Sequence, residues 1–291
     1  MTSYIILYNP HAGGGYGEEN ARKIQRILPE ADLDFVDITK IQDYRAFLEG
    51  LPPEKGLVLA GGDGTLNRFL NDTWGLTVKN SLFYFAAGSG NDFQRDVAEK
   101  HPDGLVPLDG YIQDLPRVRV QGREYRFLNG IGYGIDGYCC QEGDRLREKN
   151  QKAPNYTAIA IKGLLFHYKP TSAEITVDGE RKTYKKVWLA PTMHGRYYGG
   201  GMMPTPNQNR LGCDKTVSTM VFHSSGKLKT LMIFPSIFQG KHIDHTKEVD
   251  ILTGHTITVT FDRPTALQID GETILDVTEY HVTTEKVPVS V

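Results

Sequence analysis

This sequence has few cysteines, no long apolar run and no large excess of charge of either sign. The three cysteines cannot form a disulfide framework, because Cys139 and Cys140 are adjacent and only Cys213 remains to pair with either. No stretch approaches the roughly 20 apolar residues that a membrane span needs, and the N-terminus has no basic flank or cleavage site. We therefore expect a cytoplasmic protein that contacts a membrane only peripherally.

The charge balance argues against nucleic-acid binding. The 33 lysines and arginines nearly cancel the 35 aspartates and glutamates, which leaves a formal net charge of -2. Without a positive field there is no long-range attraction to a phosphate backbone, so we expect no nucleic-acid partner. The 291 residues suffice for two domains at roughly 150 residues each, and 39% hydrophobic residues fit a globular chain.

Glycine is abundant and clustered. The sequence has 31 glycines, which is about 11% against a typical usage of about 7%. Clustered glycines mark places where the backbone turns tightly or approaches a ligand closely. The clusters lie at residues 13–17, 61–64, 88–90, 130–137 and 199–201.

The first 115 residues alternate between strand and helix patterns. Such alternation predicts an α/β domain with a parallel sheet and helices on both faces. The expected strands are 3–8, 33–38, 56–60 and 82–86, and the expected helices are 18–28, 41–49, 65–72 and 91–98.

The pattern changes near residue 115, and residues 116–279 predict a β-rich, antiparallel second domain. Only two helical stretches interrupt it, near 154–168 and 227–239. The tail at about 280–291 has the pattern of closing strands and is a candidate to return to the first domain. The domain boundary rests on the change of period alone.

Three glycine clusters follow strands of the first domain, so they should converge at the carboxyl edge of the sheet. The loop from Asn9 to Gly17 offers successive backbone N–H groups that can bind phosphate, although a plain strand-to-helix turn has the same composition. In the second cluster, Asp63 lies between glycines at a helix start. It either caps the helix or binds a nucleotide group, directly or through Mg²⁺.

The third cluster, Gly88-Ser89-Gly90-Asn91-Asp92, again joins a strand to a helix and supplies small polar donors. An ordinary serine or asparagine cap is the alternative interpretation. A fourth segment, from Gly132 to Gly137, matches G-x-G-x-x-G. It lacks the acidic residue about twenty positions on and does not open the first βαβ unit, so we do not interpret it as a dinucleotide site.

Several motifs, taken together, resemble a known family. NPHAGGG, GGDGTLNR, AAGSGNDF, FLNGIGYGID, YYGGGMMPTPNQNRLGCD and a late IDGE look like the bacterial soluble diacylglycerol kinase-like lipid kinases. The likeness runs in order along nearly the whole chain. GGDGT alone also occurs in NAD kinases and, in variant form, in phosphofructokinases, but its combination with GSGNDF and a late DGE is more specific.

The resemblance implies an N-terminal α/β domain that binds ATP, a C-terminal β-sandwich-like domain, a cleft between them, and phosphate transfer from ATP to a lipid hydroxyl. It implies that Glu272 is the base that takes the hydroxyl proton, with Asp63 as the second catalytic acid beside Mg²⁺. On its own chemistry, however, Asp270-Gly271 favours a two-residue hairpin turn. The implied ATP-binding residues are Asn9, Gly13, Gly14, Gly15, Gly62, Asp63, Gly64, Thr65, Gly88, Ser89 and Asn91.

The sequence departs from the family pattern at two places. Arg68 stands where the family's GGDGTxNE ends in glutamate, which either strengthens phosphate attraction or signals an altered nucleotide geometry. The family's metal loop normally reads Asp-Asp-Gly, whereas here only Asp214 is kept between Cys213 and Lys215. Asp214 therefore predicts either a structural Mg²⁺ site or a solvated turn.

One apolar segment bears on the alcohol that would accept the phosphate. Apolar residues from Leu228 to Phe238 lie among Lys227, Lys229 and Lys241, as in a membrane-facing amphipathic helix or in a helix packed on the second domain. We expect ATP and a lipid or amphipathic alcohol as ligands, together with peripheral membrane contact and a homodimer. The alternatives are a kinase for a soluble alcohol and a nucleotide-binding regulatory protein without turnover.

Overall fold

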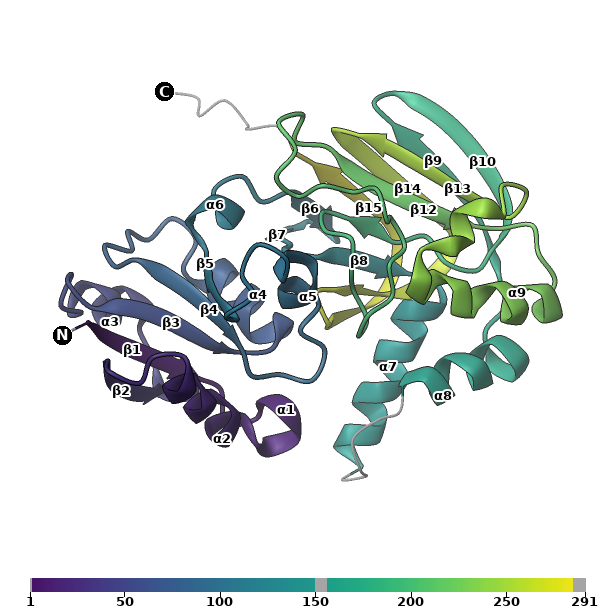
Figure 1. The fold of residues 1–291 in the computed structure, drawn as a ribbon. Helices are drawn as coiled ribbons and strands as arrows, with labels where there is room; N and C mark the ends of the chain where they lie inside the picture. Colours follow the sequence, from purple (N-terminus) through teal and green to yellow (C-terminus); the bar gives the residue numbers. More distant parts are fainter. Residues whose placement is uncertain (1, 150–155, 285–291) are drawn as a thin grey trace. The chain divides into compact units, whose positions relative to one another are not determined.

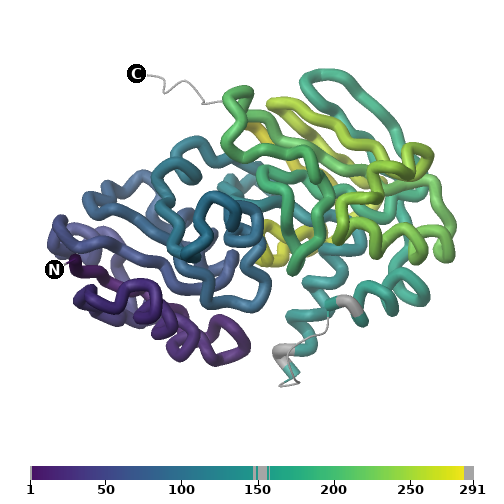
Figure 2. Tube along the Cα trace, in the orientation of Figure 1, coloured from purple at the N-terminus to yellow at the C-terminus, as the bar shows by residue number. Residues whose placement is uncertain are grey.

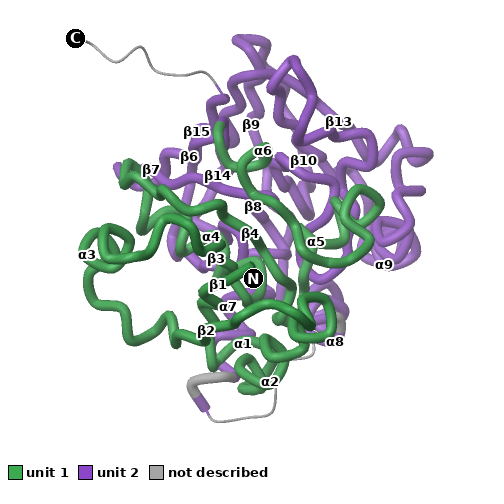
Figure 3. Tube along the Cα trace, turned by 60° about the vertical axis from the view of Figure 1, so that its left-hand side comes forward, with its two compact units in different colours: residues 1–113 green, residues 114–291 purple. Residues whose placement is uncertain are grey.

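The chain divides into two compact units, Met1–Gln113 and Asp114–Val291, which are coloured separately in Figure 3. The structure is a computed structural model that describes residues 2–149 and 156–284. The chain passes once from the first unit to the second, as the continuous colour change along the trace in Figure 2 shows. The helices and strands are labelled in Figure 1.

The first unit is built on a five-stranded sheet in the order β2-β1-β3-β4-β5. The first four strands are parallel and β5 is antiparallel to β4. Parallel strands buried on both faces need continuous apolar sequence, and β3 with the sequence GLVLAG meets that need. The strands are β1 (Ser3–Tyr8), β2 (Asp32–Asp37), β3 (Gly56–Gly61), β4 (Leu82–Ala86) and β5 (Leu105–Pro107).

Helices follow the strands as the alternating pattern predicts. Ile24 of the first crossover packs with Ile6 and Val58 in the core of this unit. The helices are α1 (Ala12–Gly15), α2 (Gly17–Arg22), η1 (Lys23–Arg26), η2 (Ile38–Lys40), α3 (Tyr44–Glu49), α4 (Asp63–Asp72), α5 (Asp92–Val97) and α6 (Asp109–Ile112). The predicted parallel-sheet domain is therefore confirmed.

The second unit is an antiparallel, sandwich-like β-domain organised around one long strand, β14 (Thr256–Ile269). The early part of β14 pairs with β9 and its late part with β8, and its register with β15 shifts between Thr260 and Leu267. The shift marks a β-bulge or irregularity between the two parts of the strand. The remaining strands are β6 (Arg117–Val120), β7 (Arg123–Arg126), β8 (Gly130–Tyr133), β9 (Thr171–Val177), β10 (Glu180–Val187), β11 (Thr192–Met193), β12 (Val217–Phe222), β13 (Val249–Gly254) and β15 (Glu272–Thr283).

The helices of the second unit differ from the expectation at one place. The sequence predicts two helical stretches there, and the structure adds a longer one, α7 (Ile135–Glu148), directly after β8. The first predicted stretch is α8 (Tyr156–Lys162) with the π-helical turn η3 (Gly163–His167), while its start at 154–155 lies outside the described residues. The second is α9 (Lys227–Ile233) with η4 (Phe234–Gln239), and η5 (Lys241–Asp244) follows.

The start of the C-terminal tail lies in the second unit. Tyr280–Thr283 form the end of β15 and pair with both β14 and β6. These residues form part of the second unit's own sheet, and alternate residues Tyr280 and Val282 are buried in that unit's core. Residues 285–291 lie outside the described part. None of the helices in residues 2–149 and 156–284 has the length and apolar character of a membrane span.

Candidate functional site

Three glycine-rich loops of the first unit meet at the carboxyl ends of β1, β3 and β4, as the sequence predicts. A Cβ atom on Gly88 would lie 2.3 Å from the Cα atom of Gly62, so the second and third loops touch through their backbones. The first loop joins them through Asn9, whose Nδ2 atom donates to Oγ1 of Thr65 at 2.9 Å. The loops thus form one continuous surface of backbone groups.

The first loop turns through three consecutive glycines with positive φ. Gly13, Gly14 and Gly15 have φ values of 59°, 72° and 95°, which side chains other than glycine rarely adopt. A chain turned in this way can aim successive N–H groups at one point. Oδ1 of Asn9 accepts the N–H of His11 at 3.0 Å and holds the loop's entry.

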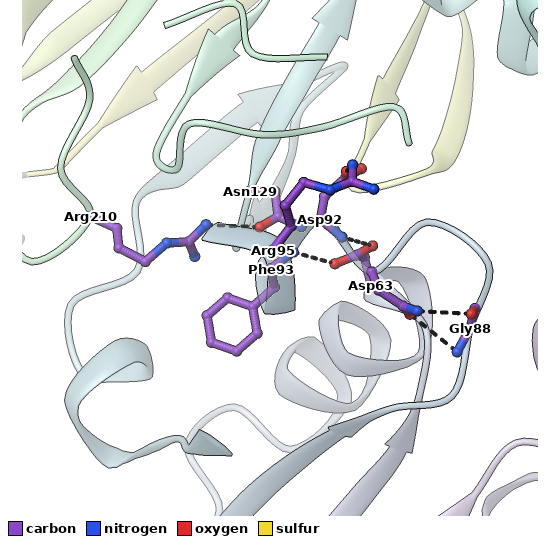
Figure 4. A network of polar contacts seen from close by, with 8 residues as sticks. Asp63, Gly88, Asp92, Phe93, Arg95, Asn129 and Arg210 are labelled. Carbon is purple, nitrogen blue, oxygen red and sulfur yellow. Dashed lines mark hydrogen bonds and ion pairs between the residues drawn. The ribbon is translucent and has the colours of Figure 1, made fainter. Parts of the chain in front are cut away.

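Asp63 binds the next helix rather than capping its own. Its two carboxylate oxygens accept the backbone N–H groups of Asp92 and Phe93, each at 2.9 Å (Figure 4). The N-cap residue of α4 is Gly62, which makes no side-chain bond. The carboxylate therefore connects the loop after β3 to the helix after β4, a role that neither sequence interpretation included.

The third loop is closed by its asparagine. Asn91 has a left-handed backbone with φ 51°, and its side-chain amide accepts the N–H of Gly88 at 3.2 Å and donates to the Gly88 carbonyl at 2.9 Å. Asp92 is 4% exposed and pairs with Arg95 at 3.2 Å. Ser89 is exposed at the loop's tip, where its hydroxyl can meet a ligand.

Arg68, the departure from the family pattern, lies on the exposed face of α4. Its charge acts on Tyr44 of α3: burial raises the pKa of that phenol, the neighbouring Asp72 raises it further, and Arg68 lowers it. The guanidinium thus lies within electrostatic reach of α3 and Asp72.

In the second unit, Asp270 and Gly271 form the two-residue turn between β14 and β15. Their φ values are 45° and 96°, and Ile269 pairs with Glu272 across the turn, as in the hairpin that Asp-Gly favours. The Asp270 carboxylate accepts three consecutive backbone N–H groups, from Leu128 at 2.5 Å and from residues 129 and 130 at 2.9 Å each. Glu272 is exposed at the start of β15.

The segment that Asp270 holds has further buried polar partners that the sequence analysis missed. Arg210, only 8% exposed, donates to the Leu128 carbonyl at 3.1 Å. It also donates to Oδ1 of Asn129 at 3.0 Å (Figure 4). His194 shares the Leu128 carbonyl through Nδ1 at 3.1 Å. The one sequence feature that could have indicated this cluster is the position of Arg210 directly before the altered metal loop.

Asp214 lies in a turn rather than in a ligand cluster. Its Oδ2 accepts the Thr216 hydroxyl at 3.2 Å, and a cavity of about 310 Å³ lies beside it, lined also by Gln208 and Asn209. Within the described part of the chain, no three His, Cys, Asp or Glu side chains gather closely enough to hold a metal ion. Mg²⁺ can bind through one carboxylate, carbonyl oxygens and water, so the oxygen-rich surroundings fit, and the site stays a prediction.

Two family models match the chain, one for each unit. The model of the diacylglycerol kinase catalytic domain matches residues 3–115. The model of the YegS C-terminal NAD kinase beta sandwich-like domain matches residues 129–290, which is more than half of the chain. The two matches together take in all three glycine loops, the Asp270 turn and Glu272.

Individual proteins agree with the family models. A diacylglycerol kinase of Mycobacterium tuberculosis (strain CDC 1551 / Oshkosh) is 26% identical over 249 residues, which cover 82% of this chain and 79% of that protein. A solved structure of a diacylglycerol kinase from Bacillus anthracis str. Sterne has a TM-score of 0.58 at 18% identity. That structural match covers 97% of this chain and 93% of the solved one.

Proposed function

Since this chain belongs to the bacterial diacylglycerol kinase-like lipid kinase family, we propose that it transfers the γ-phosphate of ATP to a hydroxyl group of a lipid such as diacylglycerol. The observation that carries the proposal is the joining of the three glycine loops around Asp63 in the first unit. The exposed carboxylate of Glu272 on the second unit supplies a candidate general base for the acceptor hydroxyl.

The glycine loops support ATP as the donor. Phosphoryl transfer needs positioning and charge neutralisation more than covalent chemistry, because its transition state is loose. Backbone N–H groups of the first loop, left-handed at Gly13 to Gly15, suit phosphate oxygens without any side chain. Ser89 and Asn91 would bind the nucleotide beside them. When bound, Mg²⁺ would neutralise phosphate charge near Asp63.

Glu272 is the residue that we assign to the acceptor. In the proposed step its carboxylate takes the hydroxyl proton while the hydroxyl oxygen bonds to the γ-phosphorus, and the bond from that phosphorus to ADP breaks. Glutamate carboxylates are among the side chains that act as general bases in enzymes. The three N–H groups held by Asp270 fix the turn that precedes Glu272. The cleft between the domains stays a prediction.

An apolar surface on the second unit supports a lipid acceptor. Leu228 and Met232 of α9 are 75% and 74% exposed, and Phe166 of η3 is 72% exposed. Nζ of Lys227 donates to the Leu165 carbonyl at 2.7 Å, which joins the start of α9 to η3. We call Leu228, Met232 and Phe166 together the exposed apolar patch. Large apolar side chains gathered in this way mark sites of contact with a partner or a membrane.

Helix α9 packs on the second unit with one face and exposes apolar side chains on the other, so it combines the two alternatives of packing and membrane contact. Thr230 and Ile233 are buried against the second unit, while Leu228 and Met232, on the other side of the helix, are exposed. Lys227, exposed at the start of α9, suits anionic phospholipid headgroups, whereas Lys229 pairs with Glu248 at 2.5 Å. We therefore propose that the patch rests on a membrane surface during catalysis. The homodimer stays a prediction.

The test is transfer of labelled phosphate. The purified full chain is incubated with γ-labelled ATP, Mg²⁺ and phosphatidylglycerol vesicles that contain diacylglycerol, or with glycerol and nucleosides in place of the vesicles. We expect label in the lipid and none in the soluble alcohols. Label only in a soluble alcohol would replace the lipid acceptor, whereas ATP binding without transfer to any acceptor would favour the regulatory alternative.

A further inference from the structure

The turn that carries Glu272 has a second attachment, made by Gln268. Oε1 of Gln268 accepts the backbone N–H of Gly271 at 2.6 Å. Gln268 is 3% exposed on β14, and Gly271 directly precedes Glu272. The glutamine therefore holds the backbone immediately before the acid from the buried side of the hairpin.

The other end of the same amide reaches α7. Nε2 of Gln268 donates to Oδ2 of Asp136 at 3.0 Å. The orientation of the amide follows from its partners: the N–H of Gly271 can only donate, so the amide oxygen must face it and the amide nitrogen must face Asp136. Asp136 must then accept, which an ionised carboxylate does with either oxygen.

Two glycines provide the space for this link. A Cβ atom on Gly132 of β8 would lie 1.5 Å from Oδ2 of Asp136, and one on Gly137 would lie 1.8 Å from the Ala266 carbonyl oxygen. The first turn of α7 can therefore lie directly against β8 and β14, with the carboxylate buried to 7% exposure. The G-x-G-x-x-G spacing here accommodates a carboxylate and not a dinucleotide.

We infer that Gln268 is a positioning residue, which links the ionised Asp136 carboxylate to the Gly271 N–H and so fixes the backbone from which Glu272 projects. The catalytic meaning of the link rests on the proposed function, because it requires Glu272 to be the base. The link itself rests only on the contacts among Asp136, Gln268 and Gly271.

The link should weaken in mild acid. Burial raises the pKa of Asp136 to about 6, and the bond from Gln268 opposes that rise. Protonation turns a charge-assisted hydrogen bond into a neutral one of about half the strength. Titratable groups on the neighbouring elements include Cys139 of α7, which is within electrostatic reach of Asp136, Tyr133 of β8, and Asp270 and Glu272 of the hairpin that Gln268 holds. Tyr198 precedes Gly199, on which a Cβ atom would lie 3.9 Å from Oδ1 of Asp136, and Asp144 further along α7 accepts the Thr273 hydroxyl. Burial raises the pKa of Cys139 and of Tyr133, so both stay protonated in this range.

The experiment follows the Gly271 amide of the full chain by ¹H–¹⁵N NMR between pH 5 and 8, without nucleotide or lipid. We expect its chemical shift to titrate with a midpoint near 6. In Asp136→Asn the shift should stay constant, because asparagine keeps an acceptor oxygen but does not titrate. In Gln268→Leu the titration should vanish and amide hydrogen exchange at Gly271 should be about 3- to 10-fold faster, as for one lost hydrogen bond.

Gln208→Leu is the matched control. Gln208 is also buried in the second unit, where it donates to the Thr216 carbonyl and accepts the Ser218 hydroxyl, and neither bond involves the hairpin. This variant should leave the Gly271 titration unchanged. An equal loss in Gln208→Leu would indicate general loosening of the unit and would overturn the assignment.

Two further results would overturn the inference: a Gly271 amide that does not move between pH 5 and 8, and one that titrates equally in Asp136→Asn. A failure of the proposed function would look different, since a chain without kinase activity can still show the Gly271 titration. If the chain is active, Gln268→Leu should lower kcat and leave KM for ATP unchanged.

Discussion

The carboxylate of Asp63 accepts the backbone N–H of Asp92 at 2.9 Å, so the acid between the glycines of one loop holds the helix that follows the next. With the adjacent N–H of Phe93 on its other oxygen, the side chain bridges two loops at the carboxyl edge of the sheet. One residue can therefore determine loop geometry and also meet the nucleotide.

Asp63→Asn should abolish detectable transfer and leave the chain folded. Asparagine turns an amide nitrogen toward one of two N–H donors, so we also expect a loss of about 1–3 kcal/mol in the free energy of unfolding. Asp43→Asn is the control, because Asp43 accepts the Ala46 N–H at the start of α3 and lies outside the glycine loops. Steady-state transfer and urea unfolding of both variants check this, and full activity in Asp63→Asn would leave the acid a structural role only.

Gly88→Ala should separate the second and third loops. The new methyl group would lie 2.3 Å from the Cα atom of Gly62, a backbone contact that cannot rotate away. Overpacking of this kind costs about 1–3 kcal/mol, and we expect at least a tenfold loss in ATP affinity by calorimetry. Gly110→Ala, where a Cβ atom would meet nothing within 4 Å, should bind ATP normally. Equal affinities in the two variants would show that the loop contact is irrelevant to the nucleotide.

Asp136 gives the second unit a distinctive pH dependence. Because burial raises the pKa of its carboxyl to about 6, the folded state binds the proton more tightly than the unfolded chain, and this group's contribution to stability is lost as pH rises through 6. The unfolding free energy of the wild type, relative to Asp136→Asn, should fall by about 2 kcal/mol from pH 4.5 to pH 7. Urea unfolding of both proteins at the two pH values measures this, and a constant difference contradicts it.

The exposed apolar patch should govern vesicle binding. Burying one large apolar side chain contributes about 1.5–3 kcal/mol, so Leu228→Ser with Met232→Ser should lower binding to phosphatidylglycerol vesicles at least tenfold. Leu275→Ser is the control, because Leu275 is 48% exposed on β15 and lies outside the patch. Vesicle sedimentation compares them, and equal binding of all variants would leave the membrane contact without support.

The sequence predicted most of the first unit because its signals are local. Each strand of the parallel sheet is a short apolar run followed by a turn and a helix, and the glycine clusters mark the carboxyl ends. The partner of Asp63 could not be predicted this way, since the N–H groups of Asp92 and Phe93 lie 29 and 30 residues away along the chain.

The second unit was harder to predict, because its contacts join residues far apart along the chain. Helix α7 was missed because its first turn contains Gly137 and half of its residues carry charged or amide side chains. Its packing against β14 depends on a strand more than 100 residues later. The Asp-Gly turn was predictable from its own chemistry. The three N–H groups that Asp270 accepts come from residues 128–130, and no local pattern indicates them.

The most direct measurement is turnover of Glu272→Gln against Glu279→Gln. Both acids are exposed on β15, and Glu279 accepts the Thr260 hydroxyl at 2.8 Å, away from the hairpin turn. General-base catalysis is worth about 10² to 10⁴ in rate, so we predict that kcat for lipid phosphorylation falls by that factor in Glu272→Gln with KM for ATP unchanged. Glu279→Gln should match the wild type. A fall of less than about tenfold in Glu272→Gln would contradict the account and leave Asp270-Gly271-Glu272 as a hairpin turn only.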